Sequence, residues 1–384
     1  MKVKHVQSAV TAAAQMLWIR LVLMAFIFVP AATCLSAEVS GELKQWHKVT
    51  VTYTAPESYS ETGDPNPFTD RRLDVVFVKG NKSYTVPGYF AADGDAANTG
   101  ASEGKIWKAH FAPPETGNWG YSGKFYSGHH VHMSDNPGTP TATFSGDFKI
   151  APTDKSGRDM RGKGWLEYVG GHYLRFKGTG EYFLKQGPDS PENLLAFEDF
   201  DGPFKNDGRN DKFVKRYSAH VKDWKTGDPT WKGGKGKGLI GAINYLASEG
   251  LNAFSFLPWA RGDDFNVYPY VDWDVHLRMD VSRLDQWAIV LEHGTKMGFF
   301  LHFKTQEMES ELMLDEGNMG PKCKPRGKVV QPQGRWSFTD GSVTRINGSG
   351  SLSIGTPPTD KDQDWAVLIK SLDAPPPTAS GNEL

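Results

Sequence analysis

The hydrophobic period of the chain changes once, near Pro152, and this change limits the folds that the sequence can form. Before Pro152, apolar residues alternate with polar ones over short runs, as at Val49, Val51 and Tyr53, which is typical of half-buried strands. After Pro152, apolar residues recur at helical spacing and continuous apolar runs follow them. The 384 residues are enough for two domains of about 100–200 residues each, so we expect two domains of different class.

The first region predicts a β-sandwich over residues 38–152. Alternation returns at residues 73–77 and 107–111, and residues 144–150 supply a last strand. A turn at residues 114–121 precedes alternating aromatics, like the corner before a late strand in immunoglobulin-like sandwiches. Short strands with frequent turns therefore indicate an immunoglobulin-like β-sandwich, a module whose usual role is binding or spacing.

The second region predicts a parallel sheet with crossover helices. Residues 166–176 form a hairpin that leads into a strand at residues 182–185. Two helical stretches, each closed by a glycine at Gly250 or Gly298, precede the buried runs 252–257 and 299–303. A helix followed by a glycine and an apolar strand, twice over, is typical of a parallel sheet, and the opening hairpin favours a barrel. We expect a partial (β/α)8 TIM-type barrel over residues 160–320.

Polar residues that follow the carboxyl ends of parallel strands converge on one mouth of such a barrel. Carboxylates, amides and exposed aromatics at this mouth suit sugars, whose hydroxyls need polar partners. We expect substrate contacts from Asp189, Glu192, Asn193, Trp259, His302 and Gln306, with Glu198 and Asp199 nearby. A turn or a helix cap explains Asp189 and Glu192 equally well, and a hydrogen-bonded core histidine explains His302 equally well.

A longer pattern carries a family resemblance. Gly-Trp-Leu-Glu-Tyr at residues 164–168 is followed by related motifs at residues 171–176, 178–185 and 189–193. Together they resemble the opening of a secreted bacterial glycoside-hydrolase-like family, over about residues 41–321. The resemblance implies an N-terminal immunoglobulin-like domain of unknown function before a (β/α)8 barrel, and an extracellular polysaccharide or oligosaccharide as partner. It supplies neither the glycan nor the catalytic residues.

Catalysis of glycoside hydrolysis requires two carboxyl groups beside the scissile bond. In related barrels these groups usually lie on the fourth and later strands, whereas the sequence predicts three strands. Glu307 is the one candidate acid, and it has no identified partner. We therefore expect an incomplete active site and no cofactor.

The stretch 321–384 is rich in proline and glycine and predicts an irregular, disordered tail. The family would continue with a further helix and strand, so we hypothesise a frameshift or truncation near Pro321. We then expect the sandwich to fold independently and residues 160–320 to pack loosely. Three functions stay open: a glycoside hydrolase, a non-catalytic carbohydrate-binding or surface-spacer protein, and a nonfunctional truncated gene product.

The N-terminus predicts export. Lys2, Lys4 and Arg20 precede the apolar run 21–29, and small residues up to Ala37 offer a cleavage site. Residues 1–37 therefore predict a signal peptide. Either Met1 or Met16 is its start. The run is about half of the ~20 residues that a membrane span needs. We expect a secreted, periplasmic or extracellular protein with no stable membrane insertion after cleavage.

The charge balance argues against nucleic acid as a partner, and the pattern of possible ligands argues against a metal site. The formal net charge of -2 provides no basic surface for nucleic acid. His129, His130 and His132 lie close together, but no cysteine or acidic triad accompanies them in the sequence, so no metal site is expected.

Overall fold

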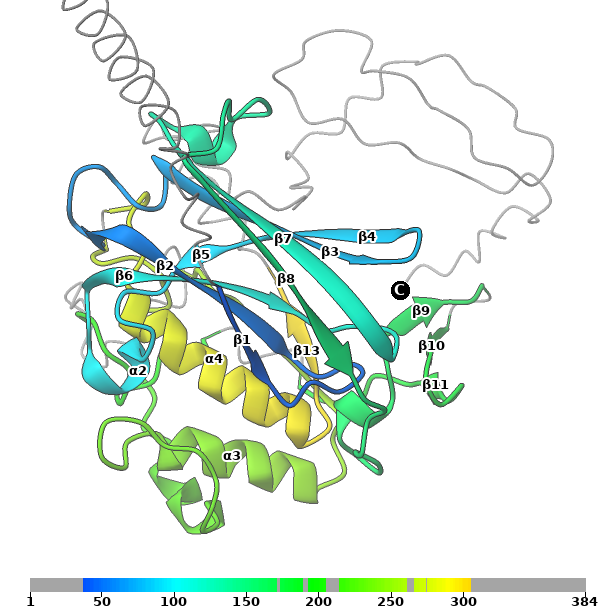
Figure 1. Cartoon of the computed structure of the whole chain (residues 1–384). Helices are drawn as coiled ribbons and strands as arrows, with labels where there is room; N and C mark the ends of the chain where they lie inside the picture. Colours follow the sequence, from blue (N-terminus) through cyan, green and yellow to red (C-terminus); the bar gives the residue numbers. More distant parts are fainter. Residues whose placement is uncertain are drawn as a thin grey trace, which may run out of the picture. The chain divides into compact units, whose positions relative to one another are not determined.

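The computed structural model describes residues 37–170, 173–188, 193–204, 214–260, 266–273 and 275–304 (Figure 1). These residues belong to one compact unit, Met1–Cys323. The predicted signal peptide and tail lie outside the described residues, as do the candidates Asp189, Glu192, Gln306 and Glu307. Within the described ranges, no helix combines the length and the apolar character of a membrane span.

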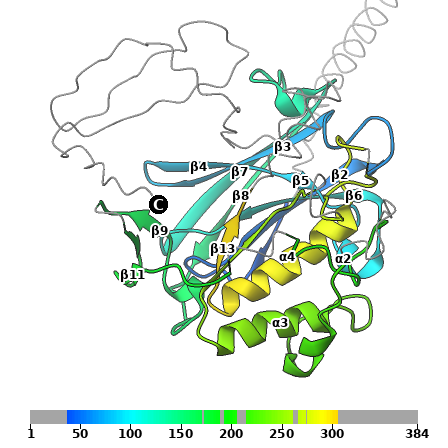
Figure 2. The ribbon, with the colours of Figure 1, turned by 180° about the vertical axis from the view of Figure 1, so that it is seen from behind.

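Two antiparallel sheets of four strands form the N-terminal region (Figures 1 and 2). The first has the order β1-β2-β6-β5, with β1 Glu38–Gly41, β2 Val49–Ser60, β6 Glu103–Phe111 and β5 Tyr89–Phe90. The second has the order β4-β3-β7-β8, with β4 Lys82–Pro87, β3 Arg71–Lys79, β7 Gly117–Ser127 and β8 Ala142–Ile150. The connections carry the short helices α2 (Ala96–Thr99) and η1 (Val131–Met133).

The alternating side chains of both sheets meet in one core. Tyr53 of β2 lies between Phe125 of β7 and Phe144 of β8, with ring centroids 5.3 and 5.1 Å away. Trp107 of β6 contacts Phe125 at 4.9 Å. Strands β6, β7 and β8 bury mainly every second residue, and these residues contribute to a core shared by both sheets. The immunoglobulin-like assignment stays a prediction.

The C-terminal region combines a small antiparallel sheet with a parallel pair. Strands β9 (Leu166–Tyr168), β10 (Leu174–Phe176) and β11 (Tyr182–Phe183) form the order β11-β10-β9, which confirms the predicted hairpin. The helices are η2 (Met160–Gly162), η3 (Ser218–Asp223), α3 (Lys237–Ser248) and α4 (Val281–Lys296). Strands β12 (Ala253–Phe256) and β13 (Phe300–Phe303) pair in parallel, which confirms the predicted crossover through α4.

The first predicted barrel strand divides between two sheets. Tyr182 and Phe183 pair with β10, but the backbone that follows runs beside β12. Ala253 N donates to Gln186 O, and two residues further on Ser255 N donates to Pro188 O, both at 3.2 Å. Both partners advance in the same direction, so residues 186–188 run parallel to β12. The described residues contain this short parallel layer and no closed barrel, and the TIM-type barrel stays a prediction.

Helix α4 lies between α3 and the β1-β2-β6-β5 sheet in both views (Figures 1 and 2). Its first backbone N–H, at Val281, donates to the Glu61 carboxylate at 3.0 Å. Further along, Gln286 Nε2 donates to Ala97 O at 3.1 Å, and Lys48 forms an ion pair with Glu292. Polar contacts therefore join the sandwich to α4 along the whole helix.

Glu61 makes this contact depend on pH. Burial, reinforced by the nearby Asp280 carboxylate, raises the pKa of Glu61 from 4.5 to about 7. The folded protein thus favours the neutral acid, and its stability falls as the pH rises from about 4.5 through about 7. We expect Glu61→Gln, which keeps an oxygen acceptor for Val281 N–H, to flatten this fall. Urea unfolding at about pH 5 and about pH 8 measures it, and the same pH dependence in both proteins contradicts the assignment.

Candidate functional site

Three polar side chains meet on one face of the parallel layer. Lys185 comes from the segment after β11, Ser255 from β12 and His302 from β13. Ser255 and His302 are register partners, so their side chains lie on the same side of the sheet. His302 Nδ1 lies 2.7 Å from Ser255 Oγ and 2.9 Å from Lys185 Nζ. We call these three residues the strand-face cluster.

The same face is apolar at the opposite ends of the strands. Ala253 and Phe300 occupy the positions two residues before Ser255 and His302, and both pack against the β9–β11 sheet. Phe300 lies 5.3 Å from Phe183, between ring centroids. The face therefore becomes polar toward the carboxyl ends of the strands, where parallel α/β folds place their sites.

The hydrogen bonds fix the protonation of His302. An ammonium group donates only, so Nδ1 accepts from Lys185 and the ring proton lies on Nε2. Ser255 Oγ lies beside the same nitrogen, but the single lone pair of Nδ1 already accepts from Lys185, so Nδ1 cannot also act as the base for the serine hydroxyl. Ser255 is also fully buried, which separates its hydroxyl from a substrate.

The other two predicted residues that the structure describes, Trp259 and Asn193, lie elsewhere. Trp259 is buried, and its ring contacts Tyr270 and His276 at centroid distances of 6.0 and 5.6 Å. Asn193 lies in a turn, where its carbonyl oxygen accepts from Ala196 N at 3.0 Å. Of the predicted set, the structure places His302 in the strand-face cluster.

Asp199 and Glu198, which the sequence placed near the substrate contacts, make contacts within the protein. Asp199 Oδ2 accepts from Gly236 N at 2.8 Å, directly before α3, where a negative charge is favourable. Glu198 pairs with Arg216 at 3.2 Å. These contacts give both residues a structural role.

The outer face of the β9–β11 sheet carries exposed tyrosines. Tyr173 and Tyr182 are 51% and 62% exposed, and their ring centroids lie 6.0 Å apart. Arg175 is the register partner of both Tyr182 and Glu167, and its ion pair with Glu167 measures 3.0 Å. We call these four residues the tyrosine face. The alternation of residues 173, 175 and 182 with buried neighbours was the sequence signal for it.

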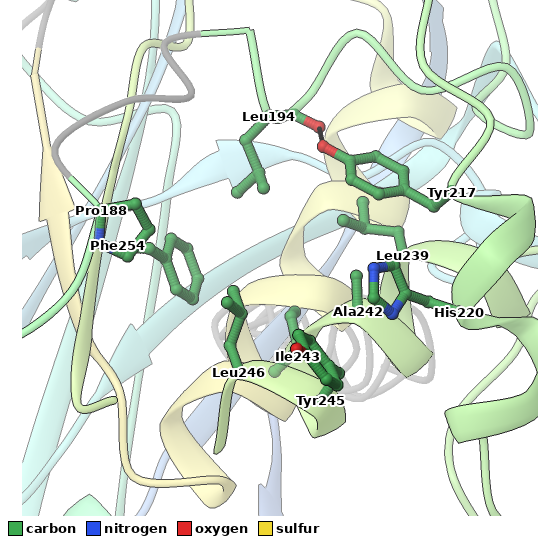
Figure 3. A pocket seen from close by; sticks show the side chains of 10 residues that line it. All are labelled: Pro188, Leu194, Tyr217, His220, Leu239, Ala242, Ile243, Tyr245, Leu246 and Phe254. Atoms are coloured by element: carbon green, nitrogen blue, oxygen red, sulfur yellow. Dashed lines mark hydrogen bonds between the residues drawn. The ribbon is translucent and has the colours of Figure 1, made fainter. Parts of the chain in front are cut away.

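An apolar pocket of about 200 Å³ lies on the other side of β12 (Figure 3). Its lining includes Phe254, Leu239, Ile243 and Leu246. The polar groups at its rim have partners: Tyr217 Oη donates to Leu194 O at 3.2 Å, and His220 Nδ1 lies 3.0 Å from Asp223 Oδ2. A pocket of hydrocarbon suits an apolar group better than a sugar, which needs several polar partners.

Comparisons with known proteins reach part of the chain. A solved structure, described as a "putative glycoside hydrolase" from Bacteroides vulgatus ATCC 8482, resembles it with a TM-score of 0.40 and 14% sequence identity. That likeness covers 68% of this chain and 40% of the other, so the chain spans less than half of that protein's length. No curated protein matches the chain. Residues 42–126, inside the two-sheet region, match the family DUF5060, described as a domain of unknown function.

Proposed function

We propose that the chain is a secreted, carbohydrate-directed protein of the glycoside-hydrolase-like type and that its tyrosine face binds the polysaccharide. The observation that supports this is the exposure of Tyr173 and Tyr182, whose rings contact each other beside the Arg175–Glu167 pair. The motifs at residues 164–193, which resemble the glycoside-hydrolase-like family, include this face.

The chemistry of the face matches that of a sugar. Tyrosine rings offer flat apolar surface to the C–H face of a pyranose, and their hydroxyls reach polar atoms at its edge. The guanidinium of Arg175 beside them can donate hydrogen bonds to sugar hydroxyls, and the carboxylate of Glu167 can accept hydrogen bonds from them. Exposed apolar groups rimmed by polar ones are typical of an interaction surface.

Binding to soluble and insoluble polysaccharides tests the proposal. We expect Tyr182→Ala and Tyr173→Ala each to weaken binding about tenfold, equivalent to about 1.4 kcal/mol. Tyr245→Ala is the matched control, because Tyr245 is an exposed tyrosine of α3 away from this face. Affinity electrophoresis followed by calorimetry measures the change. Equal binding by the Tyr182 and Tyr245 variants, or a wild-type chain that binds none of the glycans, refutes the proposal.

Hydrolysis is a second candidate function, favoured by the strand-face cluster at the carboxyl ends of the parallel strands. It also requires two carboxyl groups, and the candidate Glu307 lies outside the described residues. Release of reducing sugar by the wild-type chain, lost in His302→Ala, supports an enzyme. Binding without release supports a carbohydrate-binding protein.

A further inference from the structure

Three metal-ligating side chains from two separate segments meet at one end of the sandwich. Asp70 precedes β3, whereas His129 and His130 lie between β7 and η1. One ligand atom of each lies within 4.8 Å of the other two. His129 Nδ1 is 3.8 Å from Asp70 Oδ1, and the two imidazole rings stack with centroids 4.0 Å apart.

Strand pairing brings Asp70, which is far away in the sequence, next to the two histidines. Arg71 of β3 is the register partner of Ser127 of β7, so the residues beyond this pair are neighbours. Gly128 N donates to Asp70 O at 3.1 Å, and His132 N donates to Thr69 O at 3.0 Å. The turn that carries both histidines is thereby fixed to the loop that carries Asp70.

The Asp70 carboxylate is held in place by three hydrogen bonds. Asp70 Oδ1 accepts from His130 N at 3.0 Å and from Thr69 Oγ1 at 3.1 Å, and Oδ2 accepts from Asn66 N at 3.2 Å. Hydrogen bonds that orient a ligating group are typical of metal sites.

The backbone of His130 adds to this arrangement. Its φ of 50° lies in the left-handed region, which is unfavourable for a residue with a side chain. The strained turn directs two consecutive imidazoles to one carboxylate.

A second cluster of possible metal ligands differs from this one because its carboxylates already have cationic partners. Glu42, His47 and Asp154 also lie within ligand distance of one another. Their carboxylates already pair with cations, Glu42 with Arg161 at 2.7 Å and Asp154 with Lys155 at 3.1 Å. A metal ion would have to displace these side chains. Among the described residues, Asp70 has no such pair with lysine or arginine, and its ionic partner is His129.

We propose that Asp70, His129 and His130 form a binding site for a divalent cation of the Zn²⁺ class. Two imidazole nitrogens and one carboxylate oxygen are ligands that Zn²⁺ prefers, and water completes the coordination. The side chain of His129 is 85% exposed, so its ring is free to turn and bring the donors to coordination distance. The ion joins the loop before β3 to the turn after β7 and stabilises this end of the sandwich.

Calorimetric titration of the full chain, with any affinity tag removed, tests the site using ZnCl₂ and, in a parallel titration, MgCl₂. We expect one Zn²⁺ per chain, a higher melting temperature with ZnCl₂ than with EDTA, and no response to MgCl₂, which prefers oxygen ligands. His129→Gln and Asp70→Asn are each expected to weaken Zn²⁺ binding at least about tenfold. Asparagine keeps an oxygen acceptor for His130 N–H.

The control is His220→Gln, which removes a histidine that lies beside one carboxylate, that of Asp223, at 3.0 Å. This variant is expected to bind Zn²⁺ like the wild type. If Asp70→Asn does not fold, His129→Gln decides, because the His129 side chain is 85% exposed and its ring stacks only on the exposed His130 among the described residues. A wild-type chain that takes up no Zn²⁺, or a His129→Gln chain that binds it equally well, overturns the proposal.

Discussion

Replacing Arg283 with methionine is expected to destabilise the protein by about 3–5 kcal/mol. Arg283 is 2% exposed, and its guanidinium donates to three backbone carbonyls: Asp201 at 2.8 Å, Tyr268 at 2.7 Å and Pro203 at 3.2 Å. The Asp280 carboxylate at the start of α4 lies 3.7 Å away. Methionine fills part of the space but takes the guanidinium donor away from the carbonyls of Asp201 and Tyr268, which is the costly outcome, whereas Pro203 O keeps the Tyr268 hydroxyl as a donor.

Urea unfolding, followed by circular dichroism, measures the Arg283 effect. The control is Arg216→Met, because the Arg216 side chain is exposed and pairs with Glu198 at the surface. Surface pairs of this kind contribute at most about 1 kcal/mol. If the Arg283 variant loses no more stability than the Arg216 variant, the guanidinium does not hold these segments together.

The second large effect is expected for Trp231→Ala, about 3–5 kcal/mol. The Trp231 side chain is 1% exposed and stacks on Phe200 at 5.3 Å between centroids, with 10° between the planes. Its indole N–H donates to Asp199 O at 3.0 Å. Alanine leaves a cavity beneath the N-terminus of α3 and releases the carbonyl of a residue that caps this helix.

Thermal unfolding and limited proteolysis both report on Trp231. We expect a lower melting temperature and faster cleavage within residues 193–204 and 214–236, which Trp231 anchors. Trp165→Ala serves as the control, because Trp165 is exposed and touches Tyr84 edge-on at 6.1 Å. Equal melting temperatures for the two variants count against an anchoring role.

Local periodicity predicted the elements whose residues bury one face. Strands β2, β3, β6 and β8 of the sandwich and the β12–α4–β13 crossover follow from alternation, from helical spacing and from the glycine at 298, whereas β1, β4 and β5 were not among the predicted strands. Residues 186–238 are rich in charged residues and glycine and show no regular hydrophobic period. The structure nevertheless buries Leu195, Phe197 and Trp231 there. Such single apolar anchors have no period, so a pattern search does not find them.

The sites depend on how strands align in the folded protein, and the sequence alone does not show this alignment. His302 was predicted, but Lys185 and Ser255 were not, because their proximity depends on how three strands align. Likewise, Asp70 reaches His129 through the pairing of β3 with β7. The contact of Glu61 with Val281 joins residues far apart in the chain, and neither residue carries a local signal for it.

Helix α4 obtains several of its polar partners from the sandwich. The C-terminal half therefore depends more on the sandwich than the sandwich depends on it. Arg278, just before the helix, donates to Gly63 O at 2.6 Å, in addition to the contacts of Val281 and Gln286. A C-terminal half produced alone would start its longest helix without these acceptors, whereas the sandwich would lose contacts at its surface. Recombination between relatives is therefore expected to transfer the C-terminal half together with its own sandwich, so that both halves share one evolutionary history.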